Sequence, residues 1–266
     1  MEPKPHWSPD ADFSSCPFFI RRMDTMGLIK PAEAPVAQLP LIGFIYVTSG
    51  EVLVNVDGTP FLCQPGQILL IPQQHPFAIR YYRSAMGYTG GFAPSMLADS
   101  KPLRYLSAPL HQGFWFDEGA FMAELFNMLA TSFEKGDSAF VEKGLDLLLS
   151  RLKPNLPAVL PAAVSSFLES VFDAGRMPAT IAFYADEAGI SENYLSRLVK
   201  QATGRSVGAW IDIVRIQRAK RLLSSTDLPV IDIAASVGVE DQSYFSRLFK
   251  KETGITPSAF RKKMQG

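Results

Sequence analysis

The sequence predicts an α+β protein of two domains, with a β-rich N-terminal domain and an all-helical C-terminal domain. The chain of 266 residues is long enough for two ordinary domains, and its hydrophobic fraction of 47% is typical of globular proteins. The hydrophobic pattern has period two up to about residue 92 and helical spacing after about residue 114. Three prolines within residues 154–161 disfavour a helix there. We therefore expect domains at residues 1–153 and 162–266, joined by a linker at residues 154–161.

The N-terminal strands are predicted from alternation and turn residues between residues 41 and 92. Residues 51–56 alternate, and Asp57-Gly58 supplies the two positive-φ positions of a tight hairpin turn. Pro65-Gly66 makes a second turn, before the short apolar run of residues 68–71. Many short strands with such turns indicate a small antiparallel β-barrel or sandwich.

Two accessory helices are predicted between these strands and the linker. Apolar residues at helical spacing mark the first helix: Phe121, Leu125, Met128 and Leu129, with Ser132. The second helix, near residues 139–152, carries a stripe of larger apolar side chains: Val141, Leu145, Leu148, Leu149 and Leu152. This stripe can pack on the barrel or pair with a second subunit, and the sequence leaves both interpretations open.

The C-terminal domain contains an internal repeat. Residues 193–204 and residues 243–254 are identical at seven of twelve positions. A short apolar helix and a glycine turn precede each copy, at Gly189 and at Gly238. Each copy therefore predicts a helix-turn-helix, the arrangement that sets its second helix into a DNA major groove.

Each second helix of the repeat has one apolar face and one polar, basic face. The outward residues are Asn193, Ser196, Arg197 and Lys200 in the first copy, and Gln242, Ser243, Ser246, Arg247 and Lys250 in the second. Arginine can bond guanine in bidentate fashion, and asparagine or glutamine can do the same with adenine. A single polar stripe is often only a solvated helix face, but its occurrence on both copies favours DNA recognition. From Ile190 onward the chain also has 13 basic against 7 acidic residues.

A long helix is predicted between the two copies, beginning near Ser206 as N-cap. About 18 residues give a rod of roughly 27 Å, which can hold two recognition helices about one DNA turn apart. The residues expected to contact phosphates are Ser206, Lys251, Thr256 and Arg261.

At this point the chain resembles a known family, the AraC/XylS-type bacterial transcription regulators. Residues 231–250, followed by residues 254–257 and 260–261, match the signature of that family almost throughout. Two positions depart from it, because Val239 and Val199 stand where the family prefers phenylalanine. Both remain apolar, so they affect core packing more than DNA binding.

The resemblance implies a sequence-specific DNA-binding transcription regulator, an activator controlled by a small-molecule effector, and not an enzyme. Its implied partners are double-stranded promoter DNA, the effector, a second copy of the chain in a homodimer, and RNA polymerase. By resemblance, the outward residues of the two copies meet the DNA bases.

In this family the N-terminal half is often a cupin-like barrel that senses a small molecule and dimerises. Residues 66–75 resemble the second cupin motif, with five residues between its glycine and its proline, although Gln74 replaces the usual glycine. A barrel of this size can enclose one small ligand. The expected effector contacts are Tyr46, His75 and Tyr81.

No metal or other cofactor is expected. The three histidines, His6, His75 and His111, contain no HxH pair, whereas an enzymatic cupin holds its metal with several histidines and usually a glutamate. The alternative hypothesis is a metal-dependent cupin enzyme fused to a DNA-targeting module. Cys16 and Cys63 are read as free thiols. Because no segment resembles a signal peptide or a bilayer-spanning stretch, we expect a cytoplasmic protein without a membrane partner.

Overall fold

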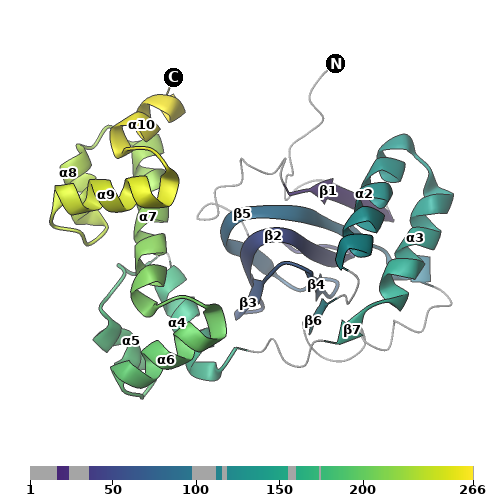
Figure 1. Cartoon of the computed structure of the whole chain (residues 1–266), viewed down its shortest axis with the longest axis horizontal. Helices are drawn as coiled ribbons and strands as arrows, with labels where there is room; N and C mark the ends of the chain where they lie inside the picture. The colour runs from purple at the N-terminus through teal and green to yellow at the C-terminus, as the bar shows by residue number, and fades with distance from the viewer. Residues whose placement is uncertain are drawn as a thin grey trace. The chain divides into compact units, whose positions relative to one another are not determined.

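A computed structural model describes residues 17–23, 36–97, 112–115, 119–154, 160–173 and 175–265 (Figure 1). The chain divides into two compact units, Met1–Val159 and Leu160–Gly266. In its described residues, the first contains an antiparallel sheet and two α-helices, and the second consists of helices. The predicted layout, a sheet domain followed by a helical domain, is confirmed. No helix of the described ranges is long and apolar enough to cross a membrane.

Within the described residues of the first unit, seven strands form one antiparallel sheet. They are β1 (Phe18–Arg22), β2 (Ile42–Val56), β3 (Thr59–Cys63), β4 (Gln67–Ile71), β5 (Phe77–Phe92), β6 (Gln112–Trp115) and β7 (Lys153–Pro154). The order is β1-β5-β2-β4-β6-β7, and β3 pairs with β2. The predicted hairpin turn between β2 and β3 is confirmed, since Asp57 and Gly58 have φ of 49° and 83°. Within the described residues no pairing joins β1 to β7, so a closed barrel is not confirmed.

A bulge in the long strand β2 changes which side chains, odd-numbered or even-numbered, face a given side of the sheet. The register with β5 shifts between Val47 and Glu51, and Gly50 lies there with φ of 72°. A Cβ on Gly50 would lie 2.3 Å from the carbonyl oxygen of Arg83, so the bulge requires glycine. The odd-numbered Val47 before the bulge and the even-numbered Val52 after it consequently belong to the same apolar cluster.

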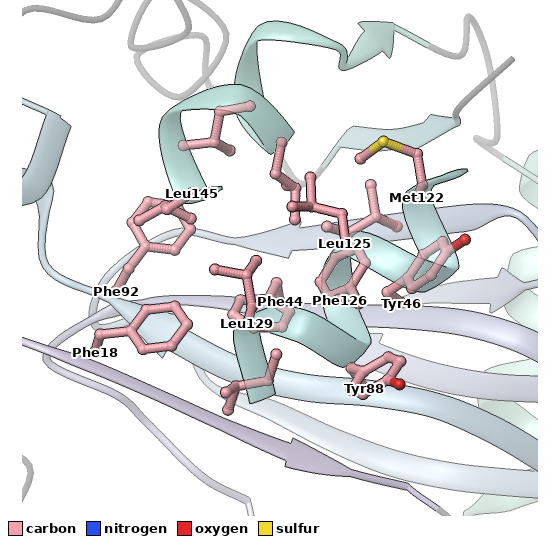
Figure 2. Packing of buried hydrophobic residues seen from close by; sticks show 14 of the residues in the cluster. Phe18, Phe44, Tyr46, Tyr88, Phe92, Met122, Leu125, Phe126, Leu129 and Leu145 are labelled. Atoms are coloured by element: carbon pink, nitrogen blue, oxygen red, sulfur yellow. The ribbon is translucent and has the colours of Figure 1, made fainter. Parts of the chain in front are cut away.

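Helices α2 (Gly119–Lys135) and α3 (Ser138–Ser150) cover the opposite face of the sheet (Figure 2). The ring of Phe126 stacks on Tyr46, with 4.3 Å between ring centroids, and on Tyr88, with 5.5 Å. The space left between sheet and helices is about 10 Å³, which is at the lower limit for a single water molecule. This side of the sheet is therefore a filled core.

The two predicted helices differ in how their apolar stripes are buried. The stripe of α3, for which packing on the sheet and pairing with a second subunit were both open, is buried within the single chain, where Leu145 and Leu149 are each 2% exposed and pack in the core. On α2, Phe121 and Met128 of the apolar stripe are exposed, at 45% and 46%. The reason is that Phe126 takes the position between the two tyrosines of the sheet, which turns the other two side chains outward.

The second unit contains seven helices within its described residues. They are α4 (Ala162–Phe172), α5 (Ile181–Glu187), α6 (Glu192–Thr203), α7 (Val207–Ser225), α8 (Val230–Ser236), α9 (Gln242–Thr253) and α10 (Pro257–Gln265). Figure 1 shows α4–α6 at one end of α7 and α8–α10 at the other. Ser206 caps α7 as predicted, since its side chain accepts from the backbone N–H of Ala209. At 1.5 Å per residue, α7 is about 28 Å long.

Helix α7 buries a different face in each half. Its first half carries Trp210, which is fully buried, and the indole N–H donates to the Thr203 hydroxyl at 2.9 Å. Its second half carries Ala219 and Leu223, which lie in a separate apolar cluster with α8 and α9. At about 100° per residue, these two buried stripes fall on roughly opposite sides of α7. Two small apolar cores, one at each half of α7, thus hold the preceding and the following helices to this one helix.

Candidate nucleic-acid interface

The pairs α5–α6 and α8–α9 are built by the same local bonds. In each, a glycine with positive φ follows the first helix, Gly189 at 64° and Gly238 at 77°. The next backbone N–H bonds back to an alanine carbonyl, from Ile190 at 3.0 Å in the first pair and from Val239 at 2.9 Å in the second. These bonds close the turn and set the second helix across the first.

The N-caps of the second helices differ. The Ser191 hydroxyl of α6 accepts from the backbone N–H of Tyr194 at 3.3 Å. The Asp241 carboxylate of α9 accepts from the backbone N–H groups of Ser243 at 2.7 Å and Tyr244 at 3.0 Å. A neutral cap therefore starts α6 and a charged cap starts α9.

Apolar side chains anchor α6 and α9 so that their opposite faces meet solvent. Leu195 and Val199 of α6 and Phe245 and Phe249 of α9 are 0% exposed. Leu198, three residues after Leu195 on the same helix, is half-buried. The sequence-predicted DNA contacts lie as follows: Asn193, Arg197, Lys200, Gln242, Ser243, Arg247 and Lys250 are exposed, and Ser196 and Ser246 are half-buried. The structure thus brings each predicted set together on one accessible helix face.

Local contacts orient several of these side chains. The guanidinium carbon of Arg197 lies 5.1 Å from the ring centroid of Tyr194. Two backbone N–H bonds, from Tyr244 and Ser243, and the Arg247 guanidinium hold the pKa of Asp241 below its usual range. The ammonium of Lys200 donates to a carbonyl at the C-terminal end of α6 at 2.6 Å, so it also caps that helix.

Tyr194 and Tyr244 were not among the predicted site residues. They occupy the same position in the two copies and are 42% and 44% exposed. The signal was present in the sequence, because a tyrosine directly follows an outward residue of the stripe in both copies, Asn193 in the first and Ser243 in the second.

The predicted phosphate contacts differ in availability. Ser206 and Thr256 accept from backbone N–H groups of Ala209 and Ala259, at 3.2 and 3.3 Å, and Lys251 is exposed. Arg261 instead turns toward its own unit and donates to the carbonyl oxygen of Leu228. It ties α10 to the connection between α7 and α8.

The three predicted effector contacts do not form one cluster. Tyr46 is 1% exposed beneath α2, where burial and the nearby Tyr88 raise its pKa to about 12. His75 pairs through Nδ1 with the Asp57 carboxylate at the strand turns. The Tyr81 hydroxyl donates to Glu51 at 3.0 Å.

The candidate metal and thiol residues are only partly described. Cys63 is buried with a free thiol, and burial raises its pKa to about 12. His6, Cys16 and His111 lie outside the described residues. Among the residues that are described, no three His, Cys, Asp or Glu side chains are grouped as ligands of a metal ion.

Both units match known families. Residues 36–149 match the AraC-like ligand binding domain, and residues 184–263 match a helix-turn-helix domain. The arabinose operon regulatory protein of Salmonella typhimurium is 32% identical over 231 residues, which cover 80% of each chain. The HTH-type transcriptional activator RhaR of Escherichia coli is 31% identical over 121 residues, 44% of this chain and 43% of that protein.

Among solved structures, the C-terminal domain of AraT, a response regulator from Geobacillus stearothermophilus, is 33% identical and has a TM-score of 0.37. It covers 39% of this chain, which covers 87% of that domain. The match to the Salmonella regulator extends over most of both chains, and the two family matches fall on the sheet unit and the helical unit respectively. The chain therefore belongs to the AraC family of bacterial transcription regulators.

Proposed function

We propose that this regulator activates transcription from promoters that it reads with two helix-turn-helix motifs, α5–α6 and α8–α9. The observation that carries the proposal is the pair of exposed, polar and basic faces on α6 and α9, held by α7. In this proposal residues 162–266 bind DNA, residues 154–161 link the domains, and residues 1–153 form a cupin-like domain that senses an effector and dimerises. Contact with RNA polymerase follows from the family resemblance. The alternative enzyme function finds no support in the relatives, which are named as regulators.

The spacing of the two motifs supports recognition of adjacent major grooves. A helix of about 28 Å approaches the roughly 34 Å of one DNA turn. Arg197 and Arg247 supply bidentate donors for guanine, and Asn193 and Gln242 supply the amide pattern that suits adenine. Lys251 and the capped N-termini at Ser206 and Thr256 provide contacts to phosphates.

Selection from random duplexes tests this function on the full chain. We expect an enriched site in which two short conserved blocks lie about one helical turn apart. Affinity for that site should fall with salt at a slope of about −0.9 per phosphate contact. Enrichment of no sequence, or of a single block only, contradicts two-motif recognition.

We propose that the effector binds on the face of the sheet opposite α2 and α3. The face beneath the helices is filled, and the opposite face carries a second apolar cluster, which includes the buried Val47, Val54 and Phe61. Tyr82 lies beside this cluster, and burial raises the pKa of its hydroxyl. None of Tyr46, His75 and Tyr81 belongs to the cluster.

This lining favours a largely apolar effector with few hydrogen-bonding groups, because a sugar needs several convergent polar groups. Two of the relatives are named for an arabinose operon, so arabinose is the informative comparison. A ligand present at a hundred times its dissociation constant should add about 2.7 kcal/mol of stability. We expect thermal shifts from an apolar aromatic or aliphatic acid and none from arabinose; the reverse result contradicts the proposed effector class.

We also propose that a homodimer forms through the outer face of α2 and α3. A groove of about 570 Å³ runs between these helices, lined in part by exposed Phe121, Met128 and Leu147. Glu124 and Lys143 also line it, from opposite helices. In a two-fold symmetric pair, Glu124 of each copy can meet Lys143 of the other, so the groove is complementary to itself.

Sedimentation velocity of the full chain tests this interface. We expect a dimer for the wild type and a monomer for the double variant Phe121→Glu with Met128→Glu. Met86→Glu is the matched control, since Met86 is 51% exposed on β5 and lies outside the groove. A dimer that persists in the double variant rules the groove out as the interface.

A further inference from the structure

The exposed tyrosine of α6 contacts one of the residues proposed to read bases. Tyr194 precedes Arg197 by three residues, so the two side chains are neighbours on the helix surface. The guanidinium carbon lies over the ring, 5.1 Å from its centroid, which is within the range of a cation–π contact. Because the ring lies on the N-terminal side, the contact draws Arg197 toward the end of the helix that meets base edges.

This contact leaves the hydrogen-bonding capacity of Arg197 unused. A guanidinium that lies over an aromatic ring offers its face to the ring and keeps its N–H donors in the guanidinium plane. Within the described residues, Arg197 makes no ion pair and no side-chain hydrogen bond. Reading guanine O6 and N7 requires two parallel N–H donors of this kind.

We infer that Tyr194 is a positioning residue for base recognition, which holds the Arg197 guanidinium toward the start of α6 with its donors free. The inference rests on the DNA-reading function proposed above. An arginine ordered before binding loses less conformational freedom when it pairs with guanine, so the ring increases discrimination at that base pair. The Tyr194 hydroxyl has no part in this role.

The second motif provides the internal comparison. Tyr244 occupies the same position in α9 and is equally exposed, but in the described part of the chain Arg247 makes no ring contact with it. Arg247 instead interacts electrostatically with the Asp241 carboxylate, which caps α9. The N-cap of α6 is the uncharged Ser191. The two arginines therefore differ in their local contacts, because Arg197 lies over a ring and Arg247 has only the electrostatic influence of the cap.

The test uses the full chain and a duplex from the selection described above. Arg197→Ala first identifies the base pair at which discrimination is lost, and duplexes that differ only there are then compared by fluorescence anisotropy. An exposed cation–π contact corresponds to an effect of about two- to fivefold. We expect Tyr194→Leu to reduce discrimination by that factor, Tyr194→Phe to retain it, and both to bind unrelated duplex DNA as the wild type does. Tyr244→Leu is the matched control and should leave discrimination at the base pair of Arg247 unchanged.

Four outcomes overturn the inference. Wild-type discrimination in Tyr194→Leu means that the ring does not position Arg197. An equal loss on every duplex makes Tyr194 a backbone contact, and a loss in Tyr194→Phe as large as in Tyr194→Leu assigns the effect to the hydroxyl. If Arg197→Ala itself leaves discrimination unchanged, the base-reading role of α6 is wrong and the inference fails with it. Circular dichroism of each variant verifies that the helices are intact.

Discussion

The helical unit and the sheet unit place their candidate functional side chains in opposite environments. On α6 and α9 the candidates lie on exposed faces, and separate apolar faces carry the packing. In the sheet unit, Tyr46 is stacked in the core and His75 and Tyr81 are bonded to carboxylates. In the helical unit, different side chains therefore serve DNA binding and packing. In the sheet unit, the candidate side chains also contribute to the stability of the fold. Changes to the two units should therefore have different readouts.

We expect the largest difference in the free energy of unfolding between substitutions of one tyrosine in each unit. Tyr46 is 1% exposed and stacks on Phe126, whereas Tyr194 is 42% exposed. We expect Tyr46→Ala to lower the free energy of unfolding by about 3 kcal/mol or more, because it leaves a cavity in a filled core. Tyr194→Ala should change it by no more than about 0.5 kcal/mol. Urea unfolding followed by circular dichroism measures both free energies. Similar losses for the two variants would contradict the different roles of these tyrosines in stability.

A second prediction compares two glycines that both have positive φ. A Cβ on Gly50 would lie 2.3 Å from backbone oxygens in the sheet, but one on Gly204, which ends α6 with φ of 73°, would meet no atom within 4 Å. Gly204→Ala should cost only the backbone strain, about 1–2 kcal/mol. Gly50→Ala adds a clash with backbone that cannot move away, so we expect a loss of about 3 kcal/mol. Equal losses in thermal unfolding would show that the bulge tolerates a side chain.

The same two units explain what could be predicted from the sequence. The faces of α6 and α9 follow from local spacing, and Ser206 has the chemistry of an N-cap, so these features were predictable. The sides of β2 depend on the bulge at Gly50, which breaks strict alternation and forms through contacts with β5. The outward rotation of Phe121 depends on Phe126 finding its place between two tyrosines of the sheet. Non-local packing of this kind leaves no periodic signal.

Within the helical unit, Arg261 and Tyr194 show the limits of spacing arguments. Arg261 is basic and lies near the proposed DNA-binding helix, but its guanidinium bonds to the carbonyl oxygen of Leu228. Tyr194 was not among the predicted site residues, because spacing alone does not show that its ring lies beneath the Arg197 guanidinium. In both cases the identity of the residue was known, and its contact depended on three-dimensional neighbours.

The smallest effect that we expect is the pH dependence of stability after removal of the N-cap of α6 or of α9. The folded-state pKa of Asp241 is depressed, so its carboxylate stabilises the fold above its unfolded pKa, near 3.9, and this contribution is lost as the pH falls through the folded value. We expect the stability difference between wild type and Asp241→Ala to be present at pH 7 and to shrink below about pH 4. Ser191 does not titrate, so the difference for Ser191→Ala should be constant with pH. Parallel pH profiles for the two variants would contradict a charged cap on α9.

Substitution of one arginine on each helix tests whether α6 and α9 both read bases while α7 holds them together. Fluorescence anisotropy of the full chain is measured on the selected site and on duplexes with single base-pair changes. We expect Arg197→Ala and Arg247→Ala each to cost about 1–3 kcal/mol in binding and to relax preference at base pairs about one helical turn apart. A uniform loss on all sequences for both variants would make these arginines phosphate contacts and would contradict the account.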